Sequence, residues 1–385
     1  AVATPTVIKT FSGTAVEQLA ILEQRGLATN EAALKLVQQL LASASDELQL
    51  AAIGFRADDA GTVRVTTRLR LKPGGQWAAT AQRVEGPSKS LLTGLPEGPF
   101  VLTAAGQYSE PVRALVRWFF GEEGRKLNPA LEKLPADQQA KLADLFGRMA
   151  DQQEGARFWI GAPKPDEPLL ASAVMIAKVE DTKKYFSQIE ELSKLQLGAD
   201  ENLPALFSLG ELQHIQVDGR EAIEYVSSMK QIEAGQPAPL PPPVKAIVKK
   251  MLGSDEKFHT YMAAIDEHTI VTAYVSVDNL RRAIAAAQGG ASSTGLEPQA
   301  AEVAALLPVG AQLAALVQPA GISQWAQLLA VAATDQKGAV VDFPPSPPIG
   351  LALKISSAGV QTDVVIPGAT LEAIGDFVAK ERNKR

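Results

Sequence analysis

The chain has 385 residues and no cysteine. Hydrophobic residues make up 46% of it and charged residues 21%, a composition typical of globular rather than disordered proteins. The net charge of −6 is the opposite of the strongly basic balance of nucleic-acid-binding proteins, so we expect no nucleic-acid partner. Without cysteine there is no disulfide, no thiolate metal site and no thiol nucleophile.

The first residues and the lack of cysteine together favour an exported protein. The sequence opens with Ala1-Val2-Ala3-Thr4-Pro5, without an initiator methionine, as it would after a signal peptidase cut at small residues. We therefore expect a soluble protein in the periplasm or outside the cell, with its leader removed. An arbitrary truncation and a cytosolic protein are the alternatives.

Two helices are predicted before residue 45, followed by a clear hairpin. A capping box at Thr14-Ala15-Val16-Glu17 starts the first helix, and apolar residues at helical spacing mark a second from about Asn30. Residues 48–71 then form two strands around the turn Asp58-Asp59-Ala60-Gly61. The return strand alternates apolar and polar residues, which predicts an antiparallel sheet with one solvated face.

The rest of the chain alternates strands and helices. Residues 100–107, 157–161 and 169–179 are predicted strands, and helices are predicted after Ser109, around 142–149 and from Asp181. Asp218-Gly219 predicts a two-residue hairpin, and Asp266-Glu267 predicts another between strands 258–265 and 268–277. The most apolar stretch, residues 304–334, contains prolines and glutamines, so we expect a strand followed by a helix there and no transmembrane segment. A hairpin at 351–366 and a last helix end the chain.

A short motif occurs twice. Leu95-Pro96-Glu97-Gly98 and Leu307-Pro308-Val309-Gly310 each precede an apolar strand that is followed by an amphipathic helix. The recurring unit is a Leu-Pro-x-Gly strand, a helix, a hairpin and a helix. We therefore predict an internal duplication with two related lobes, residues 1–200 and 201–385.

This arrangement resembles a group of uncharacterised exported bacterial proteins built from repeated Leu-Pro-x-Gly strand–helix–hairpin units. The resemblance covers residues 95–115 and 307–377 best. That group more often has an acidic residue where this chain has Gly98 and Gly310. The resemblance implies an exported protein, and it implies no functional residues.

Motifs for catalysis, metals and cofactors are missing. The three histidines, His214, His259 and His268, lie on predicted strands and are not spaced to share a metal, so we expect no metal and no cofactor. There is no Gly-x-Ser-x-Gly elbow and no phosphate-binding loop, so we name no catalytic residue. Paired carboxylates such as Asp266-Glu267 fall in predicted turns, where aspartate is favoured for its backbone hydrogen bonds.

The sharpest surface feature is a row of arginines on the predicted 48–71 hairpin. Arg64, Arg68 and Arg70 share one face of the return strand, and Arg56 precedes the turn. These guanidinium groups could bind an anionic or carboxylate-rich partner, or they could simply solvate a sheet face. We name Arg56, Arg64, Arg68 and Arg70 as the candidate binding residues and call them the arginine row.

The sequence thus predicts an α+β fold of two related lobes, each a mostly antiparallel sheet with helices packed on one face. The favoured function is non-enzymatic binding of a protein or other component of the bacterial envelope. One alternative is a carrier of an apolar, lipid-type ligand. Another is a hydrolase that uses dispersed aspartate and glutamate residues, which would need two carboxylates about 10 Å apart or less in one cleft. The oligomeric state is left open.

Overall fold

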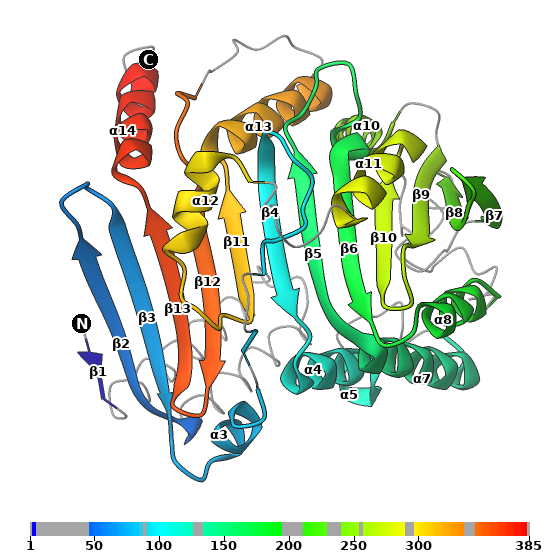
Figure 1. Ribbon diagram of the computed structural model, residues 1–385, viewed down its shortest axis with the longest axis horizontal. Coiled ribbons are helices and arrows are strands. Elements are labelled where there is room, and N and C mark those ends of the chain that lie inside the picture. The colour runs from blue at the N-terminus through cyan, green and yellow to red at the C-terminus, as the bar shows by residue number, and fades with distance from the viewer. Residues whose placement is uncertain are drawn as a thin grey trace.

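The computed structural model in Figure 1 describes most of the chain. The described residues are 2–4, 46–84, 86–87, 91–125, 134–194, 211–228, 240–253, 257–288, 296–334 and 343–382. The two helices predicted before residue 45 lie outside these ranges.

Within these ranges thirteen strands form one continuous sheet, and every neighbouring pair is antiparallel. The strand order is β1-β2-β3-β13-β12-β11-β4-β5-β6-β10-β9-β8-β7. The strands are β1 (Val2–Ala3), β2 (Leu48–Ala57), β3 (Val63–Leu71), β4 (Phe100–Gln107), β5 (Gln153–Gly161), β6 (Ala173–Val179), β7 (Glu211–Val217), β8 (Arg220–Ser228), β9 (Lys257–Ala264), β10 (Thr269–Tyr274), β11 (Leu313–Val317), β12 (Ile349–Ser356) and β13 (Gly359–Ile366). The predicted α+β class with a mostly antiparallel sheet is confirmed.

Turn chemistry explains the first hairpin. The Asp58 carboxylate accepts hydrogen bonds from the backbone N–H groups of Ala60 and Thr62, at 3.0 and 2.9 Å. Gly61 has φ of 74°, which glycine adopts without strain. The β2–β3 turn therefore lies where the sequence predicted it.

The helices connect these strands. They are α3 (Gln76–Ala81), α4 (Glu110–Phe120), α5 (Glu122–Arg125), α7 (Ala136–Gln152), the short 3-10 helix η1 (Leu169–Ser172), α8 (Thr182–Lys194), α10 (Pro242–Leu252), α11 (Val277–Gln288), α12 (Pro298–Ala305), α13 (Pro319–Thr334) and α14 (Gly368–Arg382). The stretch 304–334 is indeed divided between β11 and α13. No helix in the described part of the chain combines the length and the apolar character needed to cross a bilayer.

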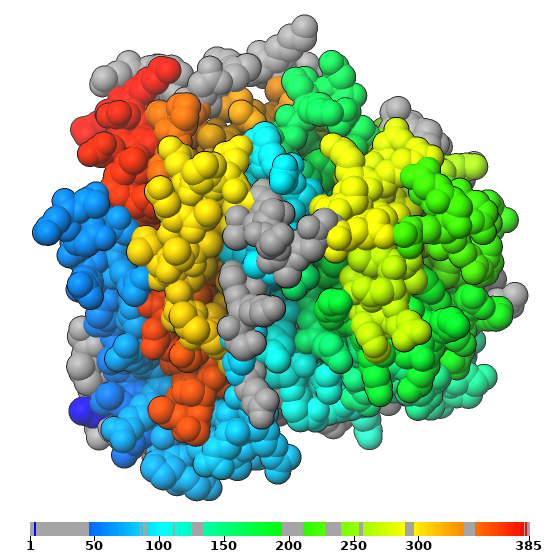
Figure 2. Space-filling model, viewed as in Figure 1, coloured from blue at the N-terminus to red at the C-terminus, as the bar shows by residue number. Residues whose placement is uncertain are grey.

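Helices cover both faces of the sheet, which corrects the prediction that they pack on one face. The neighbouring residues Ile270 and Val271 of β10 point to opposite faces and belong to different core clusters. Ile270 packs with α7 and α8, whereas Val271 packs with α11. Figures 1 and 2 show α11 and α12 standing in front of the sheet. Because β6 and β10 are apolar on both faces, each face needs its own cover.

The division into two lobes at residue 200 is not confirmed. Strands from residues 1–200 and from residues 201–385 alternate in blocks within the single sheet. The hairpin β2–β3 pairs with β13 of the second half, and the hairpin β9–β10 pairs with β6 of the first half. The predicted boundary itself lies outside the described residues.

The strand order is nevertheless symmetrical about the central pair β4–β11. On one side follow β5, β6 and the hairpin β10–β9; on the other follow β12, β13 and the hairpin β3–β2. Strands β4, β5 and β6 follow the first Leu-Pro-x-Gly motif in the chain, and β11, β12 and β13 follow the second. The hairpin β2–β3, which lies beside β13, precedes the first motif, and the hairpin β9–β10, which lies beside β6, precedes the second. This order supports the predicted duplication, which stays a prediction.

The two motifs also have similar local structure. Gly98 and Gly310 have φ of 115° and 76°, values that side chains with a Cβ atom rarely adopt. Leu95 is buried in the core cluster beside β4 and β11, and Leu307 packs against the same cluster. The motif therefore fixes a turn and a core anchor immediately before each central strand.

The interleaved order predicts that neither half of the chain folds alone. A fragment of residues 1–200 contains β4 and β6 but lacks their partners: β11, which pairs with β4, and β10, which pairs with β6. We expect this fragment to give a poorly dispersed amide spectrum and no cooperative thermal transition, and co-expression with residues 201–385 to restore both. A cooperatively folded 1–200 fragment would contradict the interleaved sheet.

Candidate functional site

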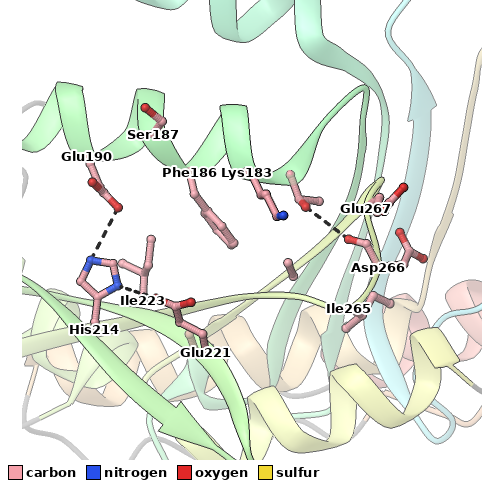
Figure 3. A pocket seen from close by; sticks show the side chains of 13 residues that line it. Lys183, Phe186, Ser187, Glu190, His214, Glu221, Ile223, Ile265, Asp266 and Glu267 are labelled. Carbon is pink, nitrogen blue, oxygen red and sulfur yellow. Dashed lines mark hydrogen bonds and ion pairs between the residues drawn. The ribbon is translucent and has the colours of Figure 1, made fainter.

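A groove of about 490 Å³ lies between α8 and the strands β7, β8 and β9. Figure 3 shows its side chains. The lining residues are Thr182, Lys183, Phe186, Ser187, Glu190, His214, Glu221, Ala222, Ile223, Ala264, Ile265, Asp266 and Glu267. Its volume falls in the range of about 300–1,000 Å³ that small-molecule sites occupy. We call it the α8 groove.

Helix α8 is oriented by its cap and its core residues. Asp181 accepts a hydrogen bond from the Lys184 backbone N–H at 3.0 Å, and this bond lowers the pKa of the Asp181 carboxyl. Tyr185 and Ile189 of the helix are buried in the core. The helix therefore presents the adjoining side, with Phe186, to the groove.

The middle of the groove is apolar. Phe186 points into the space between the helix and the strands, and Ile223 and Ile265 line the opposite wall. Ile223 is 3% exposed and belongs to the same core cluster that packs against Phe186. The apolar floor is thus an open extension of the hydrophobic core.

Two carboxylates flank an imidazole at one end of the groove. The Nε2 atom of His214 lies 3.5 Å from Glu190 Oε1 of α8, and its Nδ1 atom lies 3.3 Å from Glu221 Oε1 of β8. Figure 3 shows His214 between these two side chains. The contact joins α8 to the edge of the sheet, because β7 is the last strand.

The other end of the groove is formed by the loop between β9 and β10. The sequence predicted a two-residue turn at Asp266-Glu267, which is wrong: the strands end at Ala264 and resume at Thr269. The longer loop forms because the Asp266 carboxylate accepts hydrogen bonds from the His268 N–H at 2.7 Å and the Thr269 hydroxyl at 2.9 Å. Burial raises the pKa of Asp266, but these hydrogen bonds and nearby Lys178 outweigh it, so the pKa is lowered overall.

The other histidines have separate structural contacts. His259 Nδ1 lies 2.7 Å from Glu224 Oε1, and His268 Nδ1 lies 2.7 Å from the Glu180 carbonyl oxygen. Within the described ranges no group of three or more histidine and carboxylate side chains could hold a metal ion.

The Glu190–His214–Glu221 contact bears on the hydrolase hypothesis. Since both carboxylates touch one imidazole ring, they lie within the separation of about 10 Å at which two carboxylates can act on one glycosidic bond. Yet the Glu221 side chain is 74% exposed and has no apolar pocket of the kind that keeps a general acid protonated. Ser187 points away from His214, so the groove offers no serine–histidine pair. The hydrolase alternative stays a prediction.

The structure places the whole arginine row on one face of the sheet. Arg56 lies directly opposite Arg64, and the strand register puts Arg68 and Arg70 on the same side. Arg64 donates a hydrogen bond to the Leu306 carbonyl oxygen, while the other three are exposed. Among the described residues no carboxylate forms an ion pair with any of the four, although the buried Asp363 lies opposite Thr66 on the same face. Whether the row binds a partner remains a prediction.

The opposite, apolar face of this hairpin is only partly buried. Of the β3 residues there, only Leu71 is buried, and Ile53 and Phe55 of β2 are 43% and 74% exposed. Helix α3 packs against one end of this face, at Leu48 and Leu71, and leaves Ile53 and Phe55 exposed.

The α8 groove was not predicted from the sequence. Its walls come from three segments that are separated along the chain, and only tertiary structure brings them together. The sequence features nearest to a signal for this site were the polar His214 within an alternating strand and Phe186 on the amphipathic helix. Both features are also common in strands and helices that form no binding site.

Comparison with known proteins gives no significant match: no family model, no curated protein and no solved structure. The resemblance to exported proteins with Leu-Pro-x-Gly units therefore stays an expectation.

The lowered pKa of Asp266 predicts an acid-sensitive contribution to stability. A carboxyl whose folded pKa is depressed stabilises the native state above its unfolded pKa of 3.8, and the contribution is lost as pH falls through the folded value. Asp266→Asn should lower the urea midpoint near neutral pH, and the difference from wild type should shrink toward about pH 3. The neighbouring Glu267→Gln is the control and should leave the midpoint unchanged. A difference for Asp266→Asn that is constant with pH would refute this assignment.

Proposed function

We propose that the protein binds a small, largely apolar ligand in the α8 groove without chemical conversion. The observation that supports this most directly is the open apolar floor between α8 and β8, flanked by charged groups at both ends. Concave apolar sites with a few polar groups are the usual form of small-molecule binding sites. This corresponds to the apolar-ligand carrier that the sequence left as an alternative.

The energetics support a ligand rather than water in this space. Phe186 and Ile265 are only half-buried, so apolar surface at the groove remains in contact with solvent. Burying it under an apolar ligand is favourable by roughly 25 cal/mol for each Å² removed from water. The charged groups at the ends would then set orientation and selectivity.

Substitution of Phe186 tests this proposal. Phe186→Ser removes the aromatic wall, and we expect it to weaken binding of a neutral apolar probe such as N-phenylnaphthylamine roughly tenfold, the loss expected from one buried aromatic contact. Fluorescence titration measures the affinity. Native mass spectrometry of the purified wild type should also show a co-purifying apolar molecule.

The matched control is Phe55→Ser, because Phe55 is the more exposed aromatic, at 74%, and lies on the far part of the sheet. It should leave probe affinity unchanged. If Phe55→Ser abolishes binding and Phe186→Ser does not, the probe is binding the exposed sheet face and the proposal is wrong.

A second candidate function is attachment to an anionic surface of the bacterial envelope through the arginine row. It is favoured by the common face of the four arginines and by the lack of ion-paired carboxylates around them in the described chain. The location outside the cytoplasm that this function requires remains part of the proposal.

Vesicle binding tests the second candidate. Arg68→Ser with Arg70→Ser should weaken cosedimentation with phosphatidylglycerol vesicles by roughly tenfold or more, since each basic residue near such a surface contributes about 1 kcal/mol. The loss should be largest at low salt. Lys141→Ser on α7, an exposed lysine 3.6 Å from Asp137, is the control. Equal vesicle binding by all three proteins would exclude this role.

A further inference from the structure

We propose that the ligand of the α8 groove is a cationic amphiphile. Its positively charged head would lie in the groove beside the carboxylates of Glu190 and Glu221, and its apolar body would lie along Phe186 and Ile223. This inference rests on the proposed small-ligand function and adds the chemical class of the ligand.

The charges that line the groove are unbalanced. Four carboxylates line it, against one lysine and one histidine: the acids are Glu190, Glu221, Asp266 and Glu267, and the bases are Lys183 and His214. Lys183 lies toward the end formed by Asp266 and Glu267 (Figure 3). Of the basic side chains that line the groove, only His214 lies at the end formed by Glu190 and Glu221.

The imidazole leaves this end incompletely neutralised. Both ring nitrogens of His214 face carboxylate oxygens, at 3.5 and 3.3 Å. One histidine ring carries at most one positive charge, so it cannot balance the charge of two carboxylates. Lys194 approaches Glu190 at 3.9 Å, but its side chain is 78% exposed, and such solvated pairs are weak. A ligand cation would therefore find a carboxylate without a strong partner.

The neighbouring aromatic ring suits the same ligand. Phe186 lies one turn of α8 before Glu190, and Figure 3 shows its ring directed into the groove between the two charged ends. The negative face of an aromatic ring attracts ammonium groups at short range. Glu190 is only 33% exposed, so a cation beside it is less screened than at an open surface. An anionic head at this end would instead meet two carboxylates.

Three amphiphiles with the same decyl tail test whether the groove binds a small ligand at all and, separately, which head group it prefers. Decyltrimethylammonium, decyl maltoside and decyl sulfate carry cationic, neutral and anionic heads, and each is titrated below its micelle concentration by calorimetry at low salt. We expect the cationic compound to bind about tenfold more tightly than the neutral one, and the anionic one to bind most weakly.

Variants then locate the head group. Glu190→Gln and Glu221→Gln should each weaken binding of the cation about fivefold, the scale of a partly exposed ion pair, and leave decyl maltoside unaffected. His214→Lys places a fixed cation between the carboxylates and should remove the preference for the cationic head. Glu211→Gln, an exposed carboxylate on β7 that does not line the groove, is the matched control.

The outcomes distinguish the two proposals. If none of the three compounds binds to folded protein, the small-ligand function itself fails. If all bind with similar affinity, or the anionic one binds best, the groove is a binding site but the inference of a cationic ligand is overturned. A cation preference that is unchanged in Glu190→Gln and Glu221→Gln also overturns it, because the selectivity then arises elsewhere.

Discussion

The pairing of β4 with β11 is the contact on which the rest of the sheet depends. Five residue pairs, from Leu313–Gly106 to Val317–Leu102, join the two central strands. Backbone hydrogen bonds from Gln107 to Gln312 and from Gln318 to Val101, at 2.8 and 2.9 Å, extend the contact at both ends. Since every other strand lies outward from this pair, it sets the position of the arginine row on one side and of the α8 groove on the other.

Local features of the fold could be predicted from the sequence. The Asp58–Gly61 turn and the strand-to-helix division of residues 304–334 depend on neighbouring residues, and both were placed correctly. The predicted two-residue turn between β9 and β10 was wrong, because two hydrogen bonds to the Asp266 carboxylate stabilise a longer loop than the Asp-Glu dipeptide suggests. Long-range strand order could not be predicted, because alternating patterns show which face is apolar but not which strand lies beside it.

The candidate site lies at the end of the sheet where the helical cover is incomplete. Most of α8 packs against the core through Tyr185 and Ile189, but β7 is an edge strand that the helix only partly covers. The groove occupies the space that remains. Residue types alone could not reveal this site, because Phe186 and His214 line one groove only when α8 packs beside β7 and β8.

The interleaved hairpins also determine when the sheet can form. Thr66 of β3 donates a hydrogen bond to Asp363 of β13, across a separation of 297 residues. During synthesis the edge of β3 that does not pair with β2 has no partner strand until β13, near the end of the chain, has emerged. Such distant pairings make folding slow and leave strand edges open to association with other chains. The sheet of this chain can therefore be completed only when residues 359–366 are available to pair with β3, so its closure is one of the last steps of synthesis.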